Sequence, residues 1–133
     1  MQEKLIGVDT AVLDTGAVTM NLYCVAVESA TEGQVSNPAA TKADKIFGIL
    51  QKKTHVAGEN APYCFLGKSY VTIASAVNPK DQLVIADTQG RVRAKTTSAG
   101  DAELPVLGTA ESAGTLANSQ VVCAIQINNS CHS

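Results

Sequence analysis

Large aromatic side chains are nearly absent from this sequence: its 133 residues include two Phe, three Tyr and no Trp. Apolar residues nevertheless make up 45% of the chain, a normal share for a globular protein. The core must therefore be built mostly from Val, Ala, Ile and Leu, which favours a thin, sheet-like interior. The length suits one domain with one core.

The sequence also lacks an excess of charge of one sign. Ten Lys and Arg residues stand against twelve Asp and Glu residues, so the formal net charge is −2 and no net field draws the chain to nucleic acid or anionic lipid. We expect solvated faces, not phosphate contacts, at two small basic clusters that have no interleaved aromatic residues: Lys52-Lys53, and Arg91, Arg93 and Lys95. The sequence predicts no direct nucleic-acid partner.

Long hydrophobic runs are missing as well. No stretch approaches the roughly 20 apolar residues of a membrane helix, and the N-terminal sequence MQEKLIGVDT lacks the basic start and apolar stretch of a signal peptide. We therefore expect no membrane partner, and a chain kept in the cytosol, where thiols stay reduced. Four cysteines are predicted to be free structural thiols: Cys24, Cys64, Cys123 and Cys131.

The candidate metal ligands and nucleophiles do not form a known constellation. No Cys-x-x-Cys or His-x-x-x-His spacing occurs, and the adjoining Cys131 and His132 lie at the C-terminal end, where we expect a solvated tail. A nucleophilic Cys64 or Cys123 would need a base such as His55. Cysteines in apolar strands are usually inert, and His55 sits in the polar run QKKTHVAG, which predicts a solvated loop. We predict no metal ligand and no catalytic residue.

Two further segments carry chemistry-bearing residues without predicting a site. The sequence PYCFLGKS ends like a phosphate-binding P-loop, but Pro62 stands where the opening glycine belongs and the bulky residues 63–66 fill the loop. The carboxylates of Asp101 and Glu103 lie in a turn-rich segment, where capping explains them without acid–base catalysis. We predict no cofactor and no small-molecule substrate.

Strand patterning is widespread. Alternating residues from Val18 to Val27 predict a half-buried strand with Cys24 facing inward. The sequence IFGIL at Ile46–Leu50 predicts a buried strand or bulge. The segments YCFL and SYVTIAS, on either side of Gly67-Lys68, predict a hairpin.

The clearest hairpin signal runs from LVIA through the turn Asp87–Gly90 to RVRAK. Asp opening the turn and Gly closing it match a type I turn followed by a left-handed residue. The alternating Arg91, Arg93 and Lys95 should face solvent or a partner. The sequences PVLGTAES and VVCAIQIN predict two more strands, the second with three residues on one face: Cys123, Ile125 and Ile127.

Helical periodicity is scarce, and the one candidate for a short helix is Pro38–Lys45. The surrounding small-residue stretch Glu28–Ala43 predicts an exposed loop. Short strands at close spacing, separated by turn residues, favour an all-β fold, namely a small antiparallel β-barrel or sandwich with at most one short helix. We expect a single β domain over residues 18–133.

Several of these segments follow one another in a characteristic order: IFGIL, AGENAPYCFLGKSYV, NPKDQLVIADTQGRVRAK, VLGTAES and a closing VVCAIQI. This order of strand, glycine turn, hairpin and terminal strand resembles that of the capsid decoration (cement) proteins of tailed bacteriophages. The resemblance covers Val18–Ile127 and rests on glycines and apolar alternation. It implies a β-rich, β-tulip-like subunit, commonly a homotrimer, that clamps neighbouring major capsid proteins.

The resemblance also implies a location on the exterior of the virion capsid, after assembly in the host bacterial cytoplasm. It carries over no catalytic residues and no cofactor. Two other functions stay open. One is another phage structural subunit, such as a tail-tube or spike-base component, and the other is a small β-barrel enzyme or ligand binder that uses a cysteine or a pocket.

Residues 1–17 have two interpretations. They are an N-terminal arm that adds to a capsid surface, or the first strand of the barrel. The arm hypothesis depends on apolar residues that precede the first predicted core strand, and it assigns capsid binding to Leu5, Ile6, Val8, Val12 and Leu13.

Overall fold

The longest strand of the protein, β7, runs without interruption from Asn60 to Thr72 in the computed structural model, which describes residues 4–128 and their side chains from residue 7 onward. The hairpin predicted around Gly67-Lys68 is therefore wrong. Gly67 has a φ of 101°, yet the chain stays extended because the two halves of β7 pair with different neighbours and not with each other.

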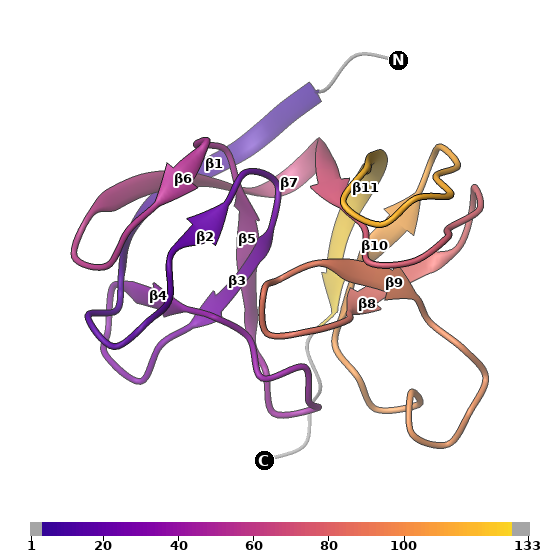
Figure 1. Cartoon of the computed structure of the whole chain (residues 1–133), viewed down its shortest axis with the longest axis horizontal. Helices are drawn as coiled ribbons and strands as arrows, with labels where there is room; N and C mark the ends of the chain where they lie inside the picture. Colours follow the sequence, from indigo (N-terminus) through magenta and orange to yellow (C-terminus); the bar gives the residue numbers. More distant parts are fainter. Residues whose placement is uncertain (1–3, 129–133) are drawn as a thin grey trace.

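The first half of β7 belongs to a small barrel (Figure 1). β1 (Lys4–Leu13) lies antiparallel to β7 and, at its end, parallel to β4 (Gln34–Ser36). β3 (Val25–Glu28) joins β4 to β5 (Ile46–Leu50), and β5 returns to β7. Within residues 4–128 these five strands close a mixed barrel. The predicted small β-barrel and the IFGIL strand are confirmed, and the β1–β4 pairing adds a parallel contact.

The second half of β7 begins another sheet. β11 (Gln120–Asn128), β10 (Val106–Ala110), β8 (Gln82–Ile85) and β9 (Val92–Ala94) follow in that order, all antiparallel. A parallel bridge between Ile73 and Val92 brings β9 back to the chain that leaves β7. Figure 1 shows the barrel and this sheet side by side, with β7 crossing between them. β2 (Met20–Asn21) and β6 (Thr54–His55) form a separate pair.

The apolar interior of the described chain divides into two clusters. The barrel core lies inside the five-stranded ring and consists of Ala11, Leu13, Met20, Cys24, Ala26, Val35, Leu50, Ala61 and Tyr63. The central core lies between the barrel wall and the second sheet and consists of Val25, Val27, Ile46, Ile49, Cys64, Val71, Ile73, Val77, Leu83, Ile85, Val92, Leu107, Ala110, Val121, Cys123 and Ile125. The interior is almost entirely aliphatic, as the scarcity of aromatic residues predicts.

β3 lies between the two cores, which explains why the strand predicted over Val18–Val27 is wrong. The chain turns at Tyr23, whose φ is 63°, so β2 and β3 are separate strands. Ala26 then faces the barrel core while its neighbours Val25 and Val27 face the central core. A strand buried on both faces keeps no polar face, so period-two alternation does not describe it. Cys24 is buried, as predicted.

The short helix predicted at Pro38–Lys45 does not form. A fold without it still agrees with the prediction of at most one short helix. The segment makes turns instead, in which the Asp44 carboxylate accepts hydrogen bonds from the backbone N–H groups of Ala39 and Thr41, each at 3.1 Å. A side chain that binds nearby backbone donors competes with helix formation. The stretch predicted as one exposed loop also contains β4, whose central residue is fully buried.

The hairpin predicted around Asp87–Gly90 is confirmed by the pairing of β8 with β9. Gly90 has a φ of 85°, and its carbonyl oxygen accepts a hydrogen bond of 2.8 Å from the N–H of Val25 in β3. Through this hydrogen bond the turn connects the second sheet to the barrel. A Cβ atom at Gly90 would lie 2.4 Å from the Val25 carbonyl oxygen, so a larger residue requires a backbone shift.

We predict that Gly90→Ala destabilises the protein much more than Gly33→Ala. Gly33 has a similar φ of 80°, but nothing lies within 4 Å of a Cβ there. The Gly33→Ala variant therefore measures the cost of placing alanine in a left-handed backbone conformation alone, about 1 kcal/mol. The clash at Gly90 should add a further loss of about 2 kcal/mol. Urea unfolding of both variants measures the difference. Equal losses would mean that the contact between the turn and β3 does not hold the two halves together.

Candidate docking groove

His55, predicted to lie in a solvated loop, is fully buried, so that prediction is wrong. Its Nε2 lies 2.6 Å from the carbonyl oxygen of Glu59, and its Nδ1 lies 2.8 Å from the hydroxyl of Tyr63. Because a carbonyl only accepts, Nε2 carries the proton in the neutral ring and Nδ1 accepts from Tyr63. Both nitrogens are thus engaged in holding β6 against the barrel core, and neither serves as a base for a thiol.

The cysteines within the described chain are free thiols in buried positions: Cys24, Cys64 and Cys123. This confirms the prediction for those three, and Cys131 lies outside the described residues, as does His132. Burial raises the pKa of the Cys24 thiol. Burial, with the nearby Glu111 carboxylate and Cys64, raises the pKa of Cys123 to about 12. A thiol with a raised pKa holds little thiolate at neutral pH, which is the opposite of an activated nucleophile.

We predict that these buried thiols do not react with an aromatic disulfide reagent at pH 7.5 while the protein is folded. Any fast reaction should disappear in a Cys131→Ser variant, and all remaining thiols should react once urea unfolds the chain. Absorbance of the released thiolate measures both. Rapid labelling of Cys24, Cys64 or Cys123 in the folded Cys131→Ser variant would contradict the prediction and favour the enzyme alternative.

Two of the three basic residues expected to face solvent or a partner, Arg91 and Arg93, are engaged within the protein. Arg91 binds the Asp87 carboxylate through Nε at 2.9 Å and Nη2 at 2.6 Å. Arg93 makes a two-pronged pair with Asp101, at 2.7 and 2.8 Å, and Thr96 donates to the same carboxylate. These hydrogen bonds to Arg93 and Thr96 lower the pKa of Asp101. The interpretation of Asp101 as a structural residue agrees with this geometry.

We predict that Asp101→Asn lowers the free energy of unfolding at pH 7 by about 2 kcal/mol, the usual value of charged hydrogen bonds in a partly buried site. The folded-state pKa of Asp101 is depressed, so its contribution is complete above the unfolded value near pH 4 and fades as the pH falls below it. The stability gap to wild type should therefore be constant from about pH 5 upward and narrower at pH 3.

The matched control is Glu103→Gln, which removes a charge from an exposed pair with Lys42 and should change stability by less than about 0.5 kcal/mol. Urea unfolding at each pH gives the values. A gap between Asp101→Asn and wild type that widens toward pH 3 would contradict the assigned role.

The segment resembling a phosphate loop lies inside β7, where it pairs with β1, and so forms no loop around an anion. Within residues 4–128, His, Cys, Asp and Glu side chains do not gather in groups of three that could hold a metal ion. The same part of the chain forms no helix with the length and apolarity to cross a membrane. The notable surface feature is instead a groove beside β7.

The groove opens where β7 leaves the barrel for the second sheet. In the described chain β5 pairs with β7 through Ile49 and Leu50, and β11 pairs with β7 from Gln120 to Ile125. The start of β5 (residues 46–48) and the end of β11 (residues 126–128) lie beyond these pairs with β7. The two strands diverge around a hollow of about 600 Å³.

Two bulges direct the side chains of β7 into this hollow. The pairing of β1 with β7 passes from Val8↔Cys64 to Gly7↔Leu66, so Phe65 is an extra residue on β7, and a second shift follows on β1. A bulge breaks the alternation of side chains, and Phe65 and Leu66 both line the groove. A Cβ atom on Gly7 would lie 2.8 Å from Leu66 and 2.9 Å from the Phe65 ring, so glycine is needed beneath them.

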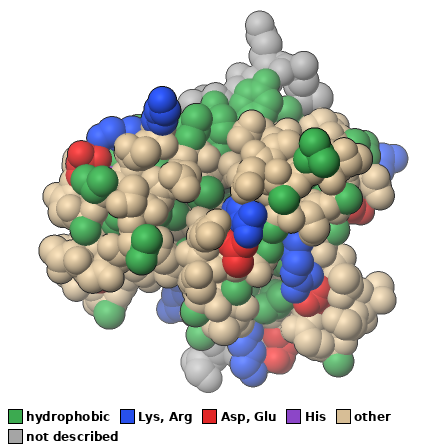
Figure 2. Space-filling view, viewed as in Figure 1, with side chains coloured by type: hydrophobic (Ala, Val, Ile, Leu, Met, Phe, Trp, Pro, Cys, Tyr) green, Lys and Arg blue, Asp and Glu red, His purple; other side chains and the backbone are tan. Residues whose placement is uncertain are grey.

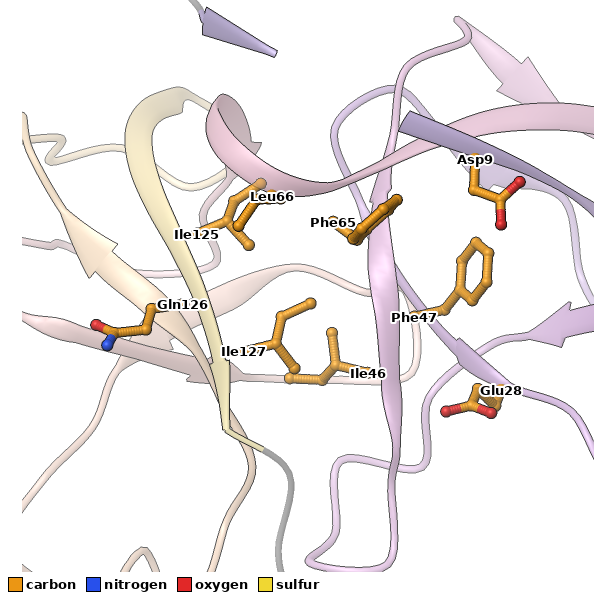
Figure 3. A pocket seen from close by; sticks show the side chains of 9 residues that line it. All are labelled: Asp9, Glu28, Ile46, Phe47, Phe65, Leu66, Ile125, Gln126 and Ile127. Carbon is orange, nitrogen blue, oxygen red and sulfur yellow. The ribbon is translucent and has the colours of Figure 1, made fainter. Parts of the chain in front are cut away.

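The lining of the groove is mainly apolar, with two carboxylates at one side. Figure 3 shows Phe65 and Leu66 from β7, Ile46 and Phe47 from β5, and Ile125 and Ile127 from β11 around the hollow. Asp9 and Glu28 lie beside Phe47, whereas Gln126 points away. Phe65 and Leu66 keep 41% and 48% of their surface exposed, although a surface position costs an apolar side chain its burial energy.

On the face drawn in Figure 2, acidic and basic side chains lie next to one another and most of the surface is uncharged. Asp9 and Glu28, beside the groove, form no ion pair with any residue that the structure describes. The groove thus combines exposed apolar side chains with unpaired negative charge.

The residues predicted to bind a capsid are distributed along β1. Val8 is 47% exposed, Val12 is half-buried and Leu13 is fully buried in the barrel core. The side chains of Leu5 and Ile6 lie outside the described residues. Leu13 is thus unavailable as a surface contact, because β1 is paired with both β7 and β4 and its inward side chains fill the barrel.

Sequence reasoning missed the groove, although the sequence contains a signal for it. Both phenylalanines of the chain, Phe47 and Phe65, line the hollow. In a sequence so poor in aromatic residues, an unbroken apolar run such as CFL beside a glycine indicates a bulge and a place where large side chains reach the surface.

Solved structures that share this fold include two from phage heads. The head fiber gp8.5 N base in bacteriophage phi29 matches with a TM-score of 0.62 and 16% sequence identity, over 90% of this chain and 93% of its own. A chain from the capsid of Myoviridae Phage XM1 matches with a TM-score of 0.62 and 16% identity, over 95% and 90%. No family profile and no curated protein matches the sequence. The chain therefore has a fold that also occurs in components of phage heads.

Proposed function

We propose that the protein is a virion structural protein that decorates the outer surface of a bacteriophage head and stabilises contacts between major capsid proteins. The observation that carries the proposal is the fold, which a head fiber base and a capsid chain share over at least 90% of each chain compared. The resemblance of Val18–Ile127 to capsid decoration proteins, drawn from the residues alone, supports the same function.

The distribution of chemical groups supports a role in binding rather than catalysis. His55 is engaged at both nitrogens, and the thiols of the described chain are buried, which raises the pKa of Cys24 and of Cys123. The apolar side chains of Val8, Phe65 and Leu66, in contrast, are about half exposed. A protein of this kind acts through buried contact area, repeated at many lattice positions.

The partner in this proposal is the major capsid protein, and the protein binds it as a homotrimer. Cyclic association lets a small subunit cover its sheet edges and present several identical contacts at once. Multivalent attachment strengthens binding by orders of magnitude when each single contact is weak. Of the β1 residues assigned to capsid binding, Val8 is the one whose described side chain is exposed enough to contribute.

A second candidate function is that of a base for a fiber or spike on the head. The structure of the phi29 head fiber N base favours this reading, because that protein shares the fold over nearly its whole length. Both functions require attachment to a shell. They differ in whether the protein carries a further appendage, and a tail-tube subunit would instead assemble into rings or filaments by itself.

We predict that the purified protein binds expanded, undecorated shells assembled from the major capsid protein of the same genome. Electron microscopy should reveal added density at fixed lattice points, and decorated shells should rupture at a higher temperature than bare ones. Light scattering should give the mass of a trimer. Shells that stay bare at saturating protein would refute decoration, and rings or filaments of the free protein would favour the tail-tube alternative.

A further inference from the structure

The groove adjoins a smaller hollow of about 180 Å³, the acidic hollow, which is lined in part by the loop between β3 and β4. Three residues line both spaces: Asp9, Glu28 and Phe47. Figure 3 shows the two carboxylates beside the Phe47 ring, and the loop adds a third carboxylate, that of Glu32. The groove and the acidic hollow therefore form one continuous surface, apolar beside β7 and acidic beside β3 and β4.

The register of the barrel explains why carboxylates occur here. Asp9 pairs with Tyr63, and Glu28 pairs with Val35, and both partners belong to the barrel core. Residues directly opposite each other in an antiparallel pair point to the same face, so Asp9 and Glu28 lie on the inward faces of β1 and β3. Both are nonetheless exposed, which places them at the rim of the barrel.

Bulges bring the large apolar side chains to the same surface. A register shift between β3 and β5 makes Phe47 an extra residue on β5, as Phe65 is on β7. Phe65 and Leu66 are 41% and 48% exposed. An apolar side chain of a partner that enters the groove would cover both and gain the burial energy that folding leaves unused. Aromatic residues are enriched at the centres of protein interfaces for this reason.

The acidic side of the surface carries charge that the described chain does not neutralise. Asp9, Glu28 and Glu32 are exposed, and none forms an ion pair with a residue that the structure describes. Lys45 lies next to Glu28 along the backbone, where its carbonyl oxygen accepts a hydrogen bond of 2.8 Å, but its side chain is in no described ion pair either. Carboxylates gathered in this way attract a Lys or Arg and repel an acidic segment.

We propose that the groove and the acidic hollow form one docking site for a surface segment of the major capsid protein. A large apolar side chain of that segment enters the groove against Phe65 and Leu66, and a Lys or Arg of the same segment lies against the carboxylates of Asp9, Glu28 and Glu32. The inference rests on the proposed function for the identity of the partner, and on the described side chains alone for the chemistry of the segment.

The test of the apolar side uses the full-length protein and a displayed library of random peptides. Selected peptides should share a large apolar residue and a nearby Lys or Arg. Phe65→Ser and Leu66→Ser should each weaken binding of the best peptide by at least roughly tenfold, the usual loss for a central apolar contact. Leu116→Ser removes an apolar side chain that is 73% exposed and lies outside both hollows, and should leave binding unchanged. Thermal unfolding checks that each variant is folded.

Charge variants test the acidic side separately. Asp9→Asn/Glu28→Gln, at exposed positions, should weaken binding of the best peptide a few-fold and reduce its salt dependence, whereas Glu103→Gln, outside both hollows, should change neither. The reversed variant Asp9→Lys/Glu28→Lys should select peptides that keep the apolar residue but carry Asp or Glu in place of Lys or Arg. Acidic peptides from the wild type, an unchanged selection after charge reversal, or no selection at all would each overturn the proposal.

The same variants on shells keep the two proposals apart. If wild-type protein decorates shells and Phe65→Ser decorates them equally well, the docking site fails as the mode of attachment while the proposed function stands. If the protein selects and binds peptides as described but leaves shells bare, the chemistry of the docking site stands, and the proposed function fails together with the capsid protein as partner.

Discussion

The structure depends on one strand that belongs to two sheets. β7 pairs with β1 and β5 along its first half and with β11 along its second, so the barrel and the second sheet share a single backbone. The neighbours of a strand must follow its twist, and β5 and β11, attached to different halves, diverge from each other. The bulge at Phe65 marks this change of partners. The groove is therefore a consequence of the topology, because a shared strand with two sets of neighbours leaves a gap where one set ends and the next begins.

The polar groups inside the fold stabilise it by satisfying one another, and this arrangement removes their reactivity. His55 is held between the hydroxyl of Tyr63 and a backbone carbonyl, and burial raises the pKa of the Tyr63 phenol. The Asp101 carboxylate is committed to Arg93 and to the loop around Thr96. Groups engaged in this way are unavailable for proton transfer or nucleophilic attack. The exposed apolar side chains beside β7, Phe65 and Leu66, are not engaged in this way.

The sequence predicted the elements that depend on local chemistry. The turn at Asp87–Gly90 and the buried strand IFGIL are set by neighbouring residues, and both form where expected. The continuity of β7 and the double burial of β3 could not be predicted, because each depends on partners that are distant in sequence. His55 was misplaced for the same reason: the run QKKTHVAG is polar, yet Tyr63 and the carbonyl of Glu59 provide a buried site for the ring. Local patterns report a residue's own preference and not the neighbours that tertiary structure supplies.

The position of the two phenylalanines links the fold to its surface. A chain that fills two cores with aliphatic residues gains more from burying a Phe than from exposing it, since a fully buried ring contributes roughly 2 to 3 kcal/mol. Phe47 partly satisfies this by packing edge-on against Tyr63, at 5.5 Å between ring centres, and so ties the groove to the barrel core. The Phe65 ring is not buried in this way. Gly7 lies beneath it and maintains the bulge that keeps the ring at the surface. Folding alone gives no reason to expose this ring, whereas a partner that covers it returns the burial energy at the moment of binding.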